Sequence, residues 1–149
     1  MKARFVACLV LMILSSVVQS QSLTPVDTRQ AIALTTAERA WVLHAMRGHV
    51  DALRDITSGV GSGNVTEAQA AAVAMGTDAM KADSTRPGTL RSKLPPAWIA
   101  MVLAMHREFD GVNEGLRAHE SATQLMARIG RVTSQCAACH GVYRIQLED

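Results

Sequence analysis

The feature that most constrains the fold is an apolar stripe that recurs in steps of three and four along two long segments. In the first segment the stripe consists of Trp98, Val102, Met105, Phe109, Val112 and Leu116. In the second it consists of Leu125, Ile129, Val132, Cys136, Cys139 and Tyr143. Residues at this spacing share one face of an α-helix, so each segment predicts an amphipathic helix with one buried side. The first is expected to begin at Pro95-Pro96, since proline suits the first turn of a helix, and the second to run from about Ser121 toward Leu147.

Two more helices are predicted upstream. One opens at Thr35, where Thr35 and Glu38 match the pattern of a capping box, and its stripe consists of Leu43, Met46, Val50 and Leu53. The other opens at Thr66, is rich in alanine and ends near Lys81. Residues 59–64 and 84–95 are rich in glycine, proline and serine and are expected to be loops. No alternating apolar and polar run predicts a strand, so the expected fold is all-α, an antiparallel four-helix bundle.

The first twenty residues predict a secretory signal peptide. Lys2 and Arg4 precede an apolar run from Phe5 to Val18, and cleavage is expected after Ser20. The run is shorter than the roughly 20 residues that cross a bilayer, which argues against a membrane anchor. We therefore expect residues 21–149 to form one exported, periplasmic domain with no membrane association after cleavage.

Composition narrows the class of function. Without Lys2 and Arg4 the chain keeps equal numbers of basic and acidic residues, from totals of 15 and 13. No basic patch interleaved with aromatic residues is present, so nucleic acid is not an expected partner. Two Trp, one Tyr and two Phe are too few to fill the core with aromatic rings. No catalytic set of Ser, His and Asp and no carboxylate pair stands out, so we expect a binding or electron-transfer protein and not an enzyme.

The motif Cys136-Ala-Ala-Cys139-His140 lies on the apolar stripe of the last predicted helix. A spacing of three places both sulfurs on one helical face. C-x-x-C-H is the attachment signature of c-type haem, with the thiols as thioethers and the histidine as an axial iron ligand. The alternatives are a non-haem metal site, with zinc ligands completed by other histidines, a thiol–disulfide exchange site, and a chance motif. The motif therefore predicts one haem c per chain, covalently bound near the C-terminus.

Around this motif the chain resembles the bundle-type cytochromes c, the cytochrome c′ group and its low-spin relatives. The resemblance covers residues 38–145 and is strongest in the stretch Cys-Ala-Ala-Cys-His-Gly-Val-Tyr-Arg that begins at Cys136. It implies that Arg39 pairs with a haem propionate and that Arg144 lies beside the axial histidine. It also implies a redox partner protein and suggests a homodimer through the first two helices.

The sixth iron position separates two functions. Alignment through Arg39 places Leu43 at this position, and leucine cannot bind iron. This favours a five-coordinate haem that transfers one electron, binds NO or CO, or does both. The alternative is a six-coordinate, low-spin electron carrier in which Met46 is the second axial ligand. His44 and His49 fall outside the stripe and are expected to face solvent.

Overall fold

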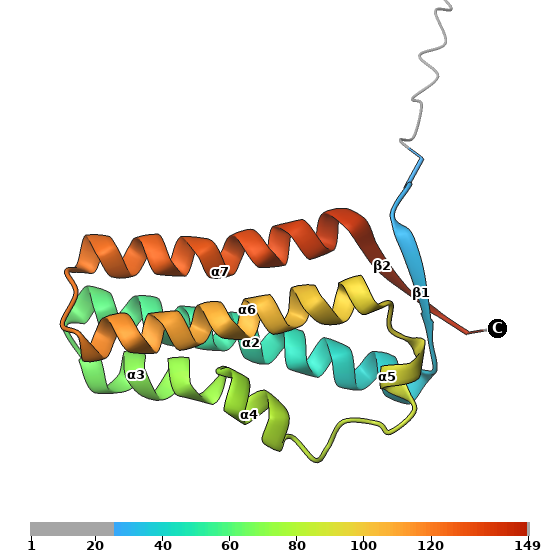
Figure 1. Cartoon of the computed structure of the whole chain (residues 1–149), viewed down its shortest axis with the longest axis horizontal. Coiled ribbons are helices and arrows are strands. Elements are labelled where there is room, and N and C mark those ends of the chain that lie inside the picture. Colours follow the sequence, from blue (N-terminus) through green and yellow to red (C-terminus); the bar gives the residue numbers. More distant parts are fainter. Residues whose placement is uncertain (1–25, 149) are drawn as a thin grey trace, which may run out of the picture.

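The computed structural model describes residues 26–148 (Figure 1). Its elements are β1 (Gln30–Leu34), α2 (Thr36–Ser62), α3 (Val65–Ala74), α4 (Thr77–Ala82), α5 (Leu90–Lys93), α6 (Pro96–Arg117), α7 (Ala122–Val142) and β2 (Tyr143–Leu147). The predicted signal peptide lies outside the described residues. Within residues 26–148 no helix has the length and apolar character needed to cross a membrane. The described chain is therefore mostly helical, with one small sheet.

The long helices lie side by side, and the two strands cross one end of them (Figure 1). α6 packs against α7, α2 packs against α3, and α3 packs against α6. The predicted stripes of α6 and α7 face this interior: Phe109, Val112 and Val132 are fully buried. A second core cluster at the strand end contains Ile32, Leu34, Val42, Leu90, Trp98 and Tyr143. Both predicted amphipathic helices are thus confirmed as the centre of the fold.

Capping residues set where two of the long helices begin. Thr35 accepts the backbone N–H of Glu38, and Glu38 accepts the N–H of Thr35, so the predicted capping box is confirmed. Ser121 and Gln124 form the same arrangement at the start of α7. The Glu38 carboxylate is buried and also accepts from Lys93 Nζ at 2.7 Å and from Thr89 Oγ1 at 2.7 Å. These hydrogen bonds connect α5 and the residue before it, Thr89, to the first turn of α2.

The loop predicted at residues 59–64 and the alanine-rich helix predicted to begin at Thr66 and end near Lys81 both differ from the structure. α2 continues to Ser62 through the stretch predicted as a loop and ends at Gly63, whose φ of 76° is the left-handed conformation that glycine favours. Asn64, not Thr66, caps the next helix. That helix stops at Ala74, and a separate α4 follows, because the Asp110 carboxylate accepts the Thr77 N–H at 3.1 Å and occupies the space beside Gly76.

The prediction of no strand is wrong at both ends of the described chain. β1 and β2 pair in parallel, with Gln30 opposite Tyr143 and Leu34 opposite Leu147. α7 therefore ends at Val142 instead of continuing toward Leu147, and Tyr143 takes an extended conformation with φ −119° and ψ 148°. The physical reason is burial: Ile32 and Leu34 alternate with exposed neighbours, and their buried face joins Tyr143 in the second core cluster.

The predicted stripe of α2 is also wrong in part. Val50 is 66% exposed, whereas Val42, Ala52 and Ile56 form the buried face. Leu43, Met46 and Leu53 are half-buried, as is His49, which was expected to face solvent. α2 thus presents two adjoining faces to the interior, one packed into the core and one lining a cavity.

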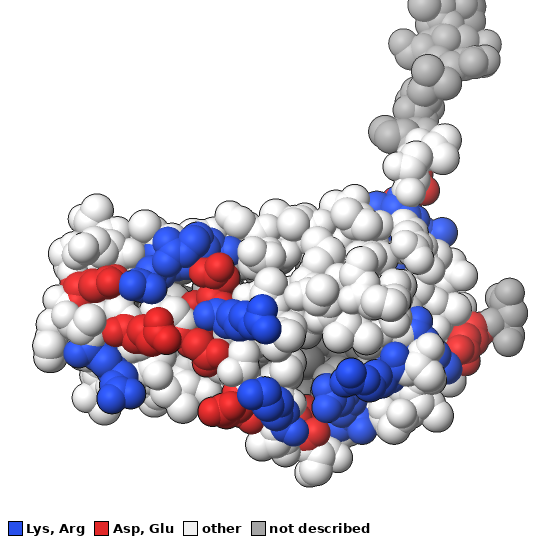
Figure 2. All heavy atoms as spheres, in the orientation of Figure 1, with Lys and Arg blue, Asp and Glu red and all other residues white. Residues whose placement is uncertain are grey.

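On the face drawn in Figure 2, acidic and basic side chains are interspersed over the helices, whereas neutral side chains cover the C-terminal half of α7. Between Arg131 and Arg144 the sequence contains no Lys, Arg, Asp or Glu. The charges at this end of α7 therefore come from neighbouring elements, such as Arg29 just before β1, which donates to the His140 carbonyl.

Candidate functional site

The last two turns of α7 carry the Cys-x-x-Cys-His motif. Cys136 and Cys139 are reduced and half-buried. Cys136 packs against the core cluster around Phe109, and Cys139 packs against the cluster around Trp98. His140 follows on the same turn with an exposed side chain. The motif therefore sits on a helix with both thiols directed inward, as the spacing predicted.

Both thiols face a cavity of about 650 Å³ between α2, α6 and α7. The volume lies within the range of cofactor and small-molecule sites, roughly 300–1,000 Å³. Its walls are mainly apolar and include the side chains of Trp41, Leu53, Trp98, Ile99, Val102 and five methionines (Met46, Met75, Met80, Met101 and Met105). Methionine is flexible and polarizable, so such a wall adapts to the shape of a large apolar group.

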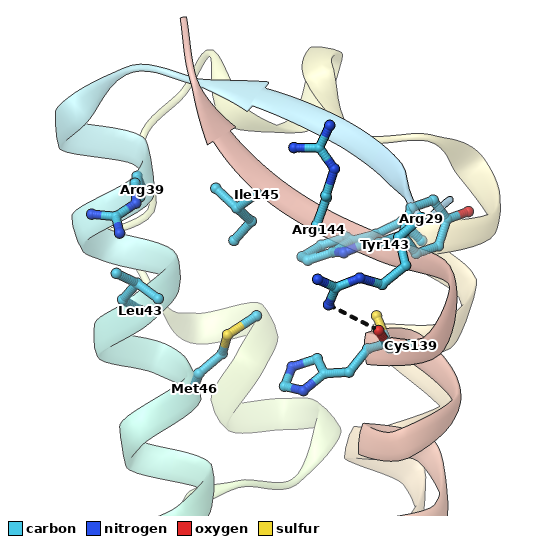
Figure 3. Close-up of a pocket in the computed structure, with 10 residues that line it drawn as sticks. Arg29, Arg39, Leu43, Met46, Cys139, Tyr143, Arg144 and Ile145 are labelled. Carbon is cyan, nitrogen blue, oxygen red and sulfur yellow. Dashed lines mark hydrogen bonds between the residues drawn. The ribbon is translucent and has the colours of Figure 1, made fainter. Parts of the chain in front are cut away.

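A smaller pocket of about 290 Å³ adjoins the cavity at the strand end of the molecule (Figure 3). The two spaces share Met46, Trp98, Cys139 and His140 in their walls. Three arginines from different elements line the pocket: Arg29 just before β1, Arg39 on α2 and Arg144 on β2. No acidic residue of the described chain lines it. The pocket is therefore suited to anionic groups that belong to a molecule extending into the apolar cavity.

The arginines differ in how fully they are paired. The Arg29 side chain makes two hydrogen bonds to the Asp27 carboxylate. These bonds are the main reason why the pKa of Asp27 is lowered to about 2. Arg144 is held more loosely: its Nε is buried without a hydrogen-bond partner and lies 3.8 Å from Asp27 Oδ2. Arg39 forms no ion pair with any residue between 26 and 148. Arg39 and Arg144 thus retain donors for a bound anion.

The structure brings the predicted site residues together. Arg39, Leu43, Met46, Cys139, His140 and Arg144 all line the arginine pocket, and Cys136 lines the adjoining cavity. Leu43 borders only the arginine pocket, whereas Met46 borders both spaces. Arg144 lies on a strand and not, as expected, one helical turn beyond His140.

Two histidines lie in the cavity wall, His106 and His49, and His49 was expected to face solvent. His106 is buried, and its Nδ1 lies 2.7 Å from the Met75 carbonyl oxygen. Because a carbonyl only accepts, this contact places the proton on Nδ1 and leaves Nε2 unprotonated. His49 meets His106 edge-on, with ring centroids 5.1 Å apart. Burial, and secondarily the charge of His106, lowers the pKa of His49 to about 4, and burial lowers that of His106. Both rings are therefore neutral at pH 7.

The alternatives to haem find less support in this geometry. Burial raises the pKa of both cysteine thiols, whereas a thiol–disulfide exchange site needs a lowered thiol pKa. Among residues 26–148 no three His, Cys, Asp or Glu side chains lie close enough to hold a metal ion, and a structural zinc site uses four ligands.

The residues present fit a haem group. Two inward thiols and an adjacent imidazole border a mainly apolar space, and the adjoining pocket contains Arg39, which has no ion pair among the described residues, and Arg144, which is only loosely paired with Asp27. Comparison with models of known families, with curated proteins and with solved structures finds no match. Function is therefore argued from the site itself.

Proposed function

We propose that this chain is a periplasmic c-type haem protein of the cytochrome c′ type, which transfers one electron, binds a small neutral gas such as NO or CO, or does both. In this proposal the described helices form an antiparallel four-helix bundle, with α3 and α4 together as one arm. The observation that carries the proposal is the position of Cys139 and His140 at the junction of the apolar cavity and the arginine pocket, with Cys136 on the wall of the cavity.

Each part of the site has a role in holding the group. Cys136 and Cys139 would hold the group through thioethers, each formed by addition of S–H across a vinyl group, and His140 would supply a nitrogen ligand to the iron. Arg39 and Arg144 bind the carboxylates, because a guanidinium pairs with a carboxylate through two parallel bonds. The bound haem supplies an iron that changes oxidation state by one electron and binds diatomic ligands.

The apolar wall controls what reaches the iron. Trp41, Leu53 and Val102 offer no charge or hydrogen-bond donor on the cavity side except the Trp41 indole, which already donates to Thr85 Oγ1 at 3.0 Å. Asp83, Arg86 and Arg91 also border this cavity, so only the apolar stretch of its wall is a poor solvent for ions. That stretch admits neutral diatomic molecules in preference to anions.

A second candidate, a six-coordinate electron carrier, is favoured by the position of Met46. Leu43, which alignment placed at the sixth iron position, borders only the arginine pocket. Met46, one turn further along α2, borders both spaces and lies opposite the α7 motif. Its thioether would therefore be available as an iron ligand from α2.

The test is production of the chain in a host with cytochrome-maturation machinery. The pyridine haemochrome spectrum of the purified protein is expected to be that of c-type haem. A colourless wild-type protein would refute the proposal. The Cys139→Ala variant is expected to retain haem poorly, since one link is lost.

The spectrum of the reduced protein with and without CO then separates the two candidate functions. A five-coordinate haem binds CO directly, whereas a Met46-bound haem binds CO only in a Met46→Leu variant. Met126→Leu, at an exposed methionine on α7, serves as the control and should behave as wild type.

A further inference from the structure

The end of α7, where His140 lies, needs a hydrogen-bond donor from elsewhere in the chain. The last four carbonyl groups of a helix have no N–H partner within the helix. At this end the Tyr143 N–H donates to the Cys139 carbonyl. The His140 carbonyl comes next, and Arg29 Nη1 donates to it at 3.3 Å across 111 residues (Figure 3). Arginine donors stabilise the C-terminal turn of a helix both by this bond and by their charge.

We propose that Arg29 is a positioning residue for the axial histidine: clamped by Asp27, it caps the last turn of α7 and thereby fixes the orientation of the His140 ring. This inference rests on the proposed haem function. Nothing in the sequence motif points to Arg29, because it lies outside every predicted helix.

The Arg29 side chain is oriented by Asp27, although both side chains are partly exposed. Its Nε donates to Asp27 Oδ1 at 2.9 Å and its Nη2 donates to Asp27 Oδ2 at 2.8 Å. Asp27 Oδ1 also accepts the Arg29 backbone N–H at 3.1 Å. This two-bond clamp occupies one side of the guanidinium and leaves Nη1 directed at the helix end. The planar fork of arginine makes this division of donors possible, and lysine cannot reproduce it.

The sheet keeps this contact in register. Gln30, directly after Arg29, is paired with Tyr143, three residues after His140. Parallel pairing continues to Leu34 and Leu147, and the backbone N–H of Glu148 donates to the Leu34 carbonyl at 3.0 Å. The backbone near Arg29 is thus fixed beside the end of α7 by bonds that do not involve the Arg29 side chain. A substitution of Arg29 therefore removes the cap while the strands remain paired.

Arg29 also contributes to the electrostatics of the site. It lines the same pocket as Arg39, Arg144 and His140. A positive charge near the haem disfavours the oxidised, more positive iron, although Asp27 offsets part of the Arg29 charge. Removing the guanidinium should therefore lower the reduction potential and, independently, change the orientation of the axial ring.

The experiment uses the haem-loaded protein and three variants, Arg29→Gln, Arg29→Lys and Asp27→Asn. Arg54→Gln is the matched control, because Arg54 is likewise an exposed arginine held by aspartate, here Asp51 and Asp55 on α2. The iron-shifted proton NMR signals of the His140 ring report ring orientation, and electrochemical titration reports the reduction potential. Circular dichroism checks that each variant is folded.

We expect the His140 ring signals to shift in all three variants and to stay unchanged in Arg54→Gln. The potential should fall in Arg29→Gln and stay near the wild-type value in Arg29→Lys, which keeps the charge but not the fork. Wild-type ring signals in both Arg29→Gln and Asp27→Asn would overturn the inference while leaving the haem proposal intact. If Arg29→Gln does not fold, Asp27→Asn alone decides, since it releases the clamp and retains the arginine. A wild-type protein without covalent haem would instead refute the proposed function.

Discussion

The neighbouring histidines His49 and His106 should make the stability of the fold depend on pH. Burial is the main cause that lowers the pKa of His49 from 6.5 to about 4, and burial also lowers the pKa of His106. In the unfolded chain both rings are exposed and bind protons at higher pH. Between about pH 4 and pH 6.5 the unfolded state therefore binds more protons than the folded state. The contribution of the neutral histidines to the free energy of unfolding is complete above pH 6.5 and is lost as the pH falls toward 4.

The expected magnitude follows from the His49 values. A folded pKa of about 4 against 6.5 unfolded corresponds to a loss of about 2 kcal/mol between pH 7 and pH 5. His106 adds a loss of the same sign. With a typical urea dependence of about 1–3 kcal/mol per molar, the unfolding midpoint should fall by about 1 M. Carboxylates act in a lower window: bonds from Lys93, then Thr89, lower the pKa of Glu38 from 4.5 to about 2, so its contribution is lost only as the pH falls below about 4.5.

The assay is urea unfolding followed by circular dichroism at pH 7 and pH 5 for wild type, His49→Gln and His119→Asn. His49→Gln removes the titrating ring and should lose less stability than wild type on acidification. His119 is an exposed histidine at the far end of α6, with a φ of 54° that asparagine tolerates. Its variant removes an exposed histidine and should match wild type. An equal midpoint shift in His49→Gln and wild type would refute the assignment of this pH dependence to the buried ring.

Three further predictions concern packing and helix stability. Phe109 is fully buried and stacks on His49 with ring centroids 6.0 Å apart, so Phe109→Ala should lower the free energy of unfolding by about 3–5 kcal/mol, measured by urea titration. A Cβ atom at Gly59 would lie 2.8 Å from both the Ala68 nitrogen and the Asn64 oxygen, so Gly59→Ala should destabilise the fold by about 1–3 kcal/mol. Gly61 has no neighbour within 4 Å of that position, so thermal unfolding of Gly61→Ala should occur at or above the wild-type temperature.

The helices and the centre of the site could be predicted because their signals are local. The stripe that ends at Tyr143 placed Cys136 and Cys139 on the inward face of α7, and the Thr35 and Ser121 caps located two helix starts. Each of these signals involves residues within one or two helical turns of each other. A single sequence is sufficient to detect them.

The strands and the two neighbouring histidines could not be predicted, because they depend on contacts between residues that are far apart in the sequence. β1 pairs with a strand more than a hundred residues away, and its five residues carry too short an alternation to predict a strand without the partner. His49 was placed on the solvent side because the α2 stripe was counted from Leu43. That count assumes one buried face, whereas α2 packs one face into the core and lines a cavity with the next. Arg29 had no local signal, since only the sheet brings it to the end of α7.

The two adjoining spaces together constrain the ligand more than either does alone. An apolar cavity of about 650 Å³ would accept many lipids or aromatic molecules, and an arginine pocket would accept many anions. A molecule that fills both must be large and apolar at one end and carry acidic groups at the other. The half-buried thiols add a third condition: Cys139 borders the junction, Cys136 borders the cavity, and burial raises the pKa of both, so they remain protonated at neutral pH. A protonated, unpaired thiol pair beside an imidazole is a poor site for thiol exchange or for a lone metal ion, and it is a suitable one for covalent attachment of an amphiphilic iron cofactor. Haem meets all three conditions at once, which is why the proposal depends on the junction and not on the motif alone.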